Sequence, residues 1–335
     1  MAKKIVALVA LILACALPNA WAQEDAADSK LKIAFIAKSY ANPVFVAAHR
    51  GAQDAAKEYT TQGIPVEVLV LTPTGENPAQ QAERIAMAVE DGADAIAVSA
   101  SEAAMVSKAV DEAVARGVAV MTFDVDLPES RRFAHYGADD TRAGETILEE
   151  LSSLIGGSGK VAVLAGNPDA PNLQRRVAGV KEAALRHPGL EIVGVFHHPE
   201  RPIDAAAEVL RVNEAHPDLK GWAMVGGWPL FESARRKEVL KDVQTRGQKI
   251  VAVDALPDQL RFVDVGVAVL LGQPVYSWGT VSISTIVDKL HYKKDVSGTI
   301  PMDLVRVSRE NLEEWAAQLR DWGFRNVNEE YLPAE

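Results

Sequence analysis

Two apolar runs that each end in an aspartate and a Leu-Pro pair constrain the fold of this chain more than any other feature. Residues 119–124 end at Asp124 before Leu127-Pro128, and residues 249–254 end at Asp254 before Leu256-Pro257. Each run predicts a buried strand that carries its aspartate to the edge of a sheet. Because ligands of open α/β sheets bind outside the carboxyl ends of the strands, we expect Asp124 and Asp254 to face one crevice between two similar lobes.

Strands and helices are predicted to alternate along most of the chain, which favours parallel sheets covered by helices on both faces. In the first half, apolar runs predict strands at 31–37, 66–71, 95–100, 118–124 and 133–138, with helices from 43, at 78–90 and at 103–115. A helix is expected after Asp139-Asp140, and the pattern then begins again. In the second half it predicts strands at 160–165, 191–196, 221–225 and 249–254, with helices at 173–185, 203–215 and around 232–244. This duplication predicts an α/β protein of two doubly wound lobes.

The C-terminal part predicts a strand at 267–271, a helix at 274–290, a strand at 303–307 and a helix at 311–319. No low-complexity linker separates the lobes, so we expect a hinge of several short crossovers. The predicted first lobe comprises 31–138 plus 274–303, and the second comprises 139–273 plus 304–335.

The first 22 residues have the composition of an export signal. Lys3-Lys4 precede an apolar stretch at 5–17 that is short for a bilayer span, and Ala20-Trp21-Ala22 forms a small-x-small cleavage site. We interpret 1–22 as a signal peptide and predict a periplasmic protein. The alternative is a lipoprotein acylated at Cys15, although Leu13 fits the corresponding cleavage box poorly.

Charge and cysteine content exclude several classes of function. The 335 residues include 35 Lys plus Arg and 46 Asp plus Glu, a net charge of −11, which argues against a nucleic-acid or anionic-membrane partner. Cleavage after Ala22 would leave no cysteine for disulfides or thiolate metal sites. The glycine-rich segment 156–160 lacks the residues of a phosphate loop, and the histidines lack metal-ligand spacing. We expect neither a metal nor a cofactor.

Several motifs in register resemble a known family. Asn42-Pro43-Val44-Phe45 follows the first strand, 122–126 is followed by 136–140, Leu173-Gln-Arg-Arg176 precedes Gly179, and Val253-Asp-Ala-Leu-Pro257 ends the later strand. This order, over nearly all of 31–308, resembles the periplasmic sugar-binding proteins of ABC transporters, in the ribose/galactose-binding branch that shares its fold with LacI-type repressors. The resemblance implies a type I periplasmic binding protein fold.

The resemblance also implies which side chains meet the sugar. An asparagine and an aromatic ring from the first loop, polar groups from the central strands, and one arginine would surround it. The positions that match are Asn42, Phe45, Ser99, Asp124, Asp140, Arg176, Asp254 and Gln273.

Three departures from the family pattern bear on the ligand. Gly226-Gly227-Trp228-Pro229 stands where the family commonly has Asn-Asp, so Trp228 is expected to contribute by stacking. Lys38 and Asp126 resemble residues of the rhamnose- and autoinducer-2-binding relatives. These departures point away from ribose.

Carboxylates accept hydrogen bonds and guanidinium donates them, so an Asp/Arg/Asn set can satisfy both functions of sugar hydroxyls. The simpler structural reading remains open: Asp124 and Asp254 could cap turns, and Arg176 could be a solvated helix charge. We predict a non-enzymatic, monomeric receptor that delivers a monosaccharide to an ABC permease.

Three alternatives belong to other classes. A secreted sugar enzyme could use Asp124 and Asp254 as paired carboxylates. A receptor for autoinducer-2 or a sugar could serve signalling instead of transport. A LacI-like regulator is disfavoured because no helix-turn-helix precedes Leu31.

Overall fold

The structure is a computed structural model that describes residues 30–231 and 233–333. The predicted signal peptide at 1–22 and the alternative acylation site at Cys15 lie outside the described residues. Within the described part of the chain, no helix has both the length and the apolar character needed to cross a bilayer.

The first lobe is built on a six-stranded sheet with the order β11-β5-β4-β3-β1-β2, in which every pairing is parallel. Its central strands are almost continuously apolar because helices cover both faces. The strands are β1 (Leu31–Ile36), β2 (Val66–Val70), β3 (Ala95–Val98), β4 (Ala119–Phe123), β5 (Ala134–Gly137) and β11 (Gly298–Pro301). The helices are α1 (Pro43–Thr61), α2 (Pro78–Glu90), α3 (Ala103–Ala115) and α9 (Val275–Leu290).

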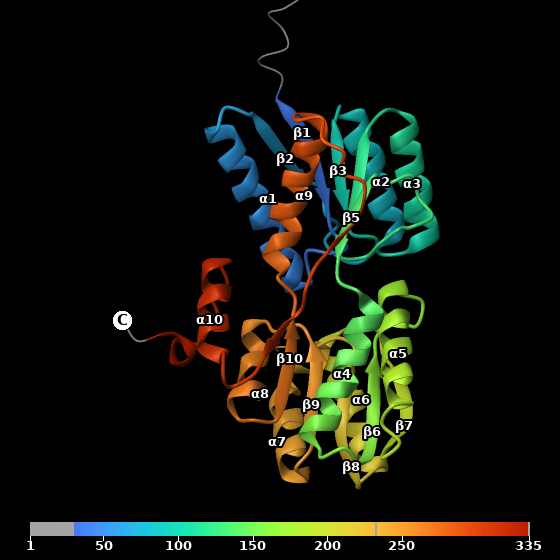
Figure 1. The fold of residues 1–335 in the computed structure, drawn as a ribbon, viewed down its shortest axis with the longest axis vertical. Coiled ribbons are helices and arrows are strands. Elements are labelled where there is room, and N and C mark those ends of the chain that lie inside the picture. The colour runs from blue at the N-terminus through green and yellow to red at the C-terminus, as the bar shows by residue number, and fades with distance from the viewer. Residues whose placement is uncertain (1–29, 232, 334–335) are drawn as a thin grey trace, which may run out of the picture.

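The second lobe repeats this plan with the order β12-β10-β9-β8-β6-β7 (Figure 1). Its strands are β6 (Gly159–Ala165), β7 (Leu190–His197), β8 (Leu219–Met224), β9 (Lys249–Val253), β10 (Ala268–Gly272) and β12 (Val305–Val307). Its helices are α4 (Asp140–Leu154), α5 (Pro171–Ala184), α6 (Pro202–Ala215), α7 (Arg236–Arg246), α8 (Leu260–Asp264) and α10 (Leu312–Asp321). Three short 3-10 turns complete it, at Trp228–Leu230, Pro257–Gln259 and Glu329–Tyr331.

The chain crosses between the two sheets after β5, after β10 and after β11. Figure 1 shows α9 returning beside α1, so the first lobe is completed by residues late in the sequence. The lobe limits that we propose from the sequence, 138/139, 273/274 and 303/304, fall within these three crossovers. All three lie at the same edge of the sheets, the edge formed by β5 with β11 and by β10 with β12.

Three elements differ from the sequence prediction. No helix was predicted at 260–264, where the structure has the five-residue helix α8. No strand was predicted at 298–301, where β11 is short, largely exposed and almost without apolar residues, and therefore carries no hydrophobic pattern. The strand expected at 303–307 is reduced to β12, which pairs antiparallel with β10.

Helices α4 and α5 are held together by glycines on both sides of their contact. A Cβ added to Gly144 would lie 1.9 Å from the carbonyl oxygen of Arg176, and one added to Gly179 would lie 2.0 Å from that of Thr141. Only glycine permits such close helix packing. This packing fixes α5, and with it Arg176, against α4 of the same lobe.

Candidate ligand-binding cleft

Asp124 and Asp254 occupy equivalent positions in the two lobes, each directly after a central strand. The backbone N–H of Asp124 donates to the carbonyl of Tyr136 over 3.0 Å, and that of Asp254 donates to the carbonyl of Leu271 over 2.9 Å. The two bonds anchor each aspartate to the next strand of its own sheet. The sequence-based expectation that both aspartates follow strand ends agrees with this geometry.

Both aspartates have left-handed backbone, with φ of 59° at Asp124 and 76° at Asp254. Aspartate tolerates this region better than most residues, but it still costs energy there. Neither side chain caps a helix. Asp124 Oδ2 instead accepts a bond from Ser99 Oγ at 2.7 Å, and Asp254 Oδ1 accepts one from Gln273 Nε2 at 2.6 Å. Strained backbone at matched positions favours a functional role over the simple turn cap.

Arg176 is buried and is held in a fixed orientation from two sides. Its Nε donates to Asp140 Oδ1, and its Nη1 donates to the carbonyl of Val225, both over 3.0 Å. Its other terminal nitrogen, Nη2, has no hydrogen-bond partner among the described residues. Arg176 also lowers the pKa of both Asp124 and Asp254 electrostatically, although other effects dominate these values. The sequence predicted a ligand contact here, and the geometry leaves donors free for one.

Burial raises the pKa of Asp124 to about 6, despite the opposing effects of Lys38, Ser99 and Arg176. Burial likewise raises the pKa of Asp254, against the hydrogen bond from Gln273 and the charge of Arg176. Both carboxylates are therefore incompletely compensated by the protein. Donors supplied by a ligand would stabilise their charged forms.

Lys38 is buried at the end of β1 and connects the two lobes electrostatically. Burial lowers its pKa, but Glu76, Glu200 and Asp124 outweigh this effect and the net pKa is raised. Its Nζ lies 3.2 Å from Glu76 Oε1 in the same lobe. Glu200 belongs to the second lobe, where it accepts a bond from the backbone N–H of Asn167 at 3.1 Å.

The packing of neighbouring side chains explains why glycines occupy positions 226 and 227, where the sequence departs from the family pattern. A Cβ on Gly226 would lie 2.5 Å from the ring of Trp228, and one on Gly227 would lie 1.8 Å from Gln259 Nε2. Trp228 thus packs directly on the backbone of Gly226. Its ring meets His198 edge to face at 4.8 Å.

A cavity of about 940 Å³ lies between the lobes, and we call it the outer cavity. Asn42 and Trp228, both predicted from the sequence as ligand contacts, line it. Asn42 also caps α1, since its side chain accepts a bond from the backbone N–H of Val44 at 3.3 Å. Asp124, Arg176 and Asp254 do not line this cavity but lie toward the hinge side of the cleft.

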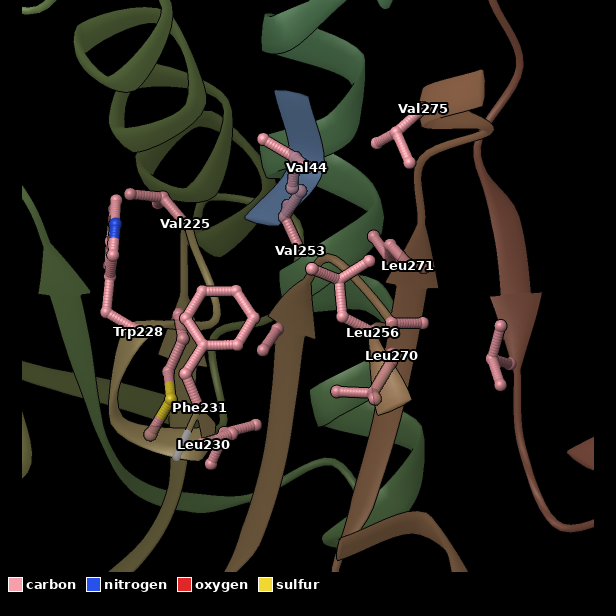
Figure 2. Close-up of a cluster of buried hydrophobic side chains, with 14 of the residues drawn as sticks. Val44, Val225, Trp228, Leu230, Phe231, Val253, Leu256, Leu270, Leu271 and Val275 are labelled. Atoms are coloured by element: carbon pink, nitrogen blue, oxygen red, sulfur yellow. The ribbon is translucent and has the colours of Figure 1, made fainter. Parts of the chain in front are cut away.

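The lobes are in apolar contact beside the aspartates. Figure 2 shows Val44 of the first lobe in one buried cluster with Val225 and Val253, at strand ends of the second lobe. The two lobes therefore share a continuous core at the centre of the cleft.

Three predicted contacts have side chains that are engaged by other parts of the protein in this structure. Phe45 was expected to cover the sugar, but it is 2% exposed and its ring packs 5.8 Å from that of Trp278. It faces the core because α1 presents this side of the helix to α9. In this structure the ring of Phe45 is therefore part of the core.

Asp126 and Asp140 were also expected at the ligand, but their oxygens are occupied by the protein. Asp126 accepts bonds from both Nε and Nη2 of Arg132 and from Thr122 Oγ1. Asp140 is 5% exposed and accepts from Arg175 and Arg176. Their role in this structure is to orient arginines.

Sequence reasoning missed Glu76, Asn167, His198 and Glu200, which all line the outer cavity. The signal lies at 197–200, because β7 ends at His197 and His198-Pro199-Glu200 follow it, so that an apolar run is followed by polar residues and a proline. The same rule that identified Asp124 would have identified Glu200. The pattern is weaker here than at the central strands because β7 is half-exposed and less apolar.

No group of three or more His, Cys, Asp or Glu side chains within 30–231 and 233–333 is arranged to hold a metal ion. The polar groups of the cleft are hydrogen-bond donors and acceptors. Their arrangement suits a polyhydroxylated ligand.

Two similar lobes, three hinge crossings and matched polar groups facing one cleft define a two-lobed solute-binding protein. Residues 33–294 match the family model described as periplasmic binding protein domain. The chain therefore belongs to this family, and its fold is that of the type I periplasmic binding proteins.

Curated relatives of the chain are sugar-binding proteins. It is 26% identical over 177 residues to a ribose import binding protein of Bacillus subtilis, covering 52% of this chain and 56% of the relative. It is 23% identical over 197 residues to a D-ribose/D-allose-binding protein of Pseudomonas aeruginosa, covering 57% and 61%. The chain thus spans only about half to three-fifths of the length of these relatives.

Solved structures match over most of the chain. An ABC transporter solute-binding protein from Burkholderia graminis, in complex with D-arabinose, gives a TM-score of 0.75 at 26% identity and covers 85% of this chain and 97% of its own. A Caulobacter myo-inositol binding protein gives 0.74 at 20% identity and covers 88% and 98%, which supports the fold alone.

Proposed function

We propose that this protein is an exported receptor that closes its two lobes around a sugar and delivers it to an ABC importer. The observation that carries the proposal is the matched pair Asp124 and Asp254, both strained, incompletely compensated and accompanied by Arg176. The two carboxylates can accept further hydrogen bonds, and Arg176 Nη2, which has no partner among the described residues, can donate them. Together these groups complement the hydroxyl groups of a sugar, which both donate and accept. The named relatives, which bind ribose, allose or arabinose, support a sugar as the ligand.

We also propose that the protein is exported to the periplasm, that it delivers the sugar to a membrane permease, and that it acts as a monomer. The segment 1–22 would direct the chain to the periplasm, and a membrane permease would receive the sugar there. The name of the Bacillus relative as an import binding protein and that of the Burkholderia protein as an ABC transporter component support this role.

We expect sugar to close the cleft. Lobes joined by three short crossovers can rotate about the hinge, and a ligand that contacts both lobes selects the closed state. Solution scattering should therefore give a smaller radius of gyration at saturating sugar than without sugar. A sugar that binds by calorimetry without any such change would contradict closure.

The same samples distinguish a receptor from a sugar enzyme. An enzyme that uses Asp124 and Asp254 as paired carboxylates would convert the sugar during prolonged incubation, whereas a receptor returns it unchanged. Sustained product formation in these samples would overturn the receptor function.

We expect sugar affinity to fall below about pH 6. The pKa of Asp124 is raised to about 6, so the unliganded folded protein takes up a proton there as the pH falls through this value. If sugar hydroxyls bind the carboxylate form, affinity at pH 5 should be lower by up to about tenfold than at pH 7.5. Calorimetric titration across this range checks the effect.

Asp124→Asn provides the matched control for this pH dependence, because its amide does not titrate. Its affinity, although lower, should vary little between pH 7.5 and 5. An unchanged pH profile in this variant would assign the dependence to another group.

A further inference from the structure

The cleft contains two parts that differ in position and chemistry. The three hinge crossings lie at the edge formed by β5, β11, β10 and β12, whereas β2 and β7 form the opposite edges of the two sheets. Asp124 and Asp254 follow β4 and β9, on the hinge half of the sheets. The outer cavity is lined mainly by the loops that follow β1, β2, β6, β7 and β8, and so lies toward the open side.

The outer cavity is large for one sugar ring. Its volume is about 940 Å³, whereas cavities of about 300–1,000 Å³ hold drug-sized ligands. A single pyranose that contacts Asp124, Arg176 and Asp254 would leave most of this space to water. The cavity therefore offers room for a second unit of the ligand.

The two parts are electrostatically continuous. Lys38 interacts with Asp124 on the hinge side and with Glu76 and Glu200, which line the outer cavity. Glu200 also interacts with Arg176, although burial is the larger influence and raises its pKa. One extended ligand could therefore contact both parts.

The walls of the outer cavity fit a neutral sugar ring. Trp228 is an aromatic surface for the apolar face of a pyranose, and Asn42, Asn167, Glu76 and Glu200 supply acceptors and donors for its hydroxyls. Three carboxylates, those of Glu76, Asp169 and Glu200, line the outer cavity together with one guanidinium, that of Arg201, which is paired with Asp204. An anionic substituent would be repelled.

We infer that the physiological ligand is a neutral disaccharide, with one ring at Asp124, Arg176 and Asp254 and the second ring in the outer cavity beside Trp228. This inference rests on the proposed function and extends it from a single sugar ring to two.

Matched calorimetric titrations test the inference with D-glucose and cellobiose, D-xylose and xylobiose, and D-galactose and lactose. At least one disaccharide should bind roughly tenfold or more tightly than either of its monosaccharides, a difference of about 1.4 kcal/mol. If every disaccharide binds more weakly than its monosaccharides, the outer subsite is overturned.

Gly75→Phe tests the outer cavity separately from the hinge side of the cleft. Gly75 lines the cavity, and a Cβ there meets open space within 4 Å. Phenylalanine should fill the cavity and remove the disaccharide advantage, while monosaccharide affinity stays within about twofold. Gly75→Ala is the control and should behave as wild type. A Gly75→Phe protein that retains the full advantage would also overturn the inference.

The outcomes separate the inference from the proposed function. Monosaccharide binding that depends on Arg176 but gains nothing from a second ring would leave the receptor function intact and remove the outer subsite. Failure of every sugar to bind would overturn both.

Discussion

Replacing Arg176 by alanine should lower sugar affinity by roughly a hundredfold or more. Each hydrogen bond from a charged group to a buried partner contributes about 1.5–3 kcal/mol. Among the described residues, Arg176 Nη2 has no hydrogen-bond partner, and the charge of Arg176 acts on both cleft aspartates. The substitution also leaves Asp140 buried with one arginine fewer, so the melting temperature should fall as well. Calorimetric titration at a temperature where the variant remains folded measures the affinity.

Arg175 offers a control on the next residue of the same helix. Its side chain is 40% exposed, and it also donates to Asp140, at 2.9 Å from Nη2 to Oδ2. Arg175→Ala therefore removes a bond to the same carboxylate without removing the free donor of Arg176. Sugar affinity should stay within about threefold of wild type. Equal losses in the two variants would show that Asp140, and not direct contact by Arg176, governs binding.

The sequence predicted the parts of the fold that leave a strong hydrophobic pattern. Buried central strands such as β4 and β9 are continuously apolar and end in polar residues, so both the lobes and the two strained aspartates could be located. The strand β11 could not, because an exposed four-residue edge strand formed after a long crossover depends on pairing with β5, not on its own composition.

The candidate site was predictable by position but not by side-chain direction. Phe45 follows the correct loop, yet the rotation of α1 turns its ring into the core. Asp126 lies two residues after Asp124, yet both of its oxygens accept hydrogen bonds from Arg132. Which of two neighbouring carboxylates is held by an arginine depends on tertiary contacts, and a single sequence does not report them.

The Gly226-Gly227 segment shows the same limit of sequence-based prediction, here for side chains that are absent. The sequence showed that a polar side chain was absent and that Trp228 followed. It could not show that the ring of Trp228 lies against Gly226, or that Gln259 requires the space beside Gly227. The glycines are therefore part of the wall that holds Trp228 at the cleft.

Asparagine at positions 124, 254 and 126 should separate ligand contacts from structural carboxylates. Asparagine keeps the shape of aspartate and tolerates left-handed backbone, so it preserves the strained turns. Because burial raises the pKa of Asp124 and Asp254, their charges destabilise the unliganded fold, and these two substitutions should leave the melting temperature unchanged or raise it. Each should weaken sugar binding by roughly tenfold to a hundredfold.

Asp126→Asn should do the opposite. Burial alone would raise the pKa of Asp126, but hydrogen bonds from Arg132 and the charges of His135 and Arg132 outweigh it, and the net pKa is lowered. A lowered carboxyl pKa means that the charged form stabilises the fold at neutral pH and that this stability is lost on acidification. Asp126→Asn should therefore lower the melting temperature at pH 7, by an amount that shrinks toward low pH, while sugar affinity stays near wild type. Thermal unfolding and titration of the three variants in parallel decide the assignment: lower stability with intact affinity at Asp124 and Asp254 would make them structural residues and would move the ligand away from the hinge half of the cleft.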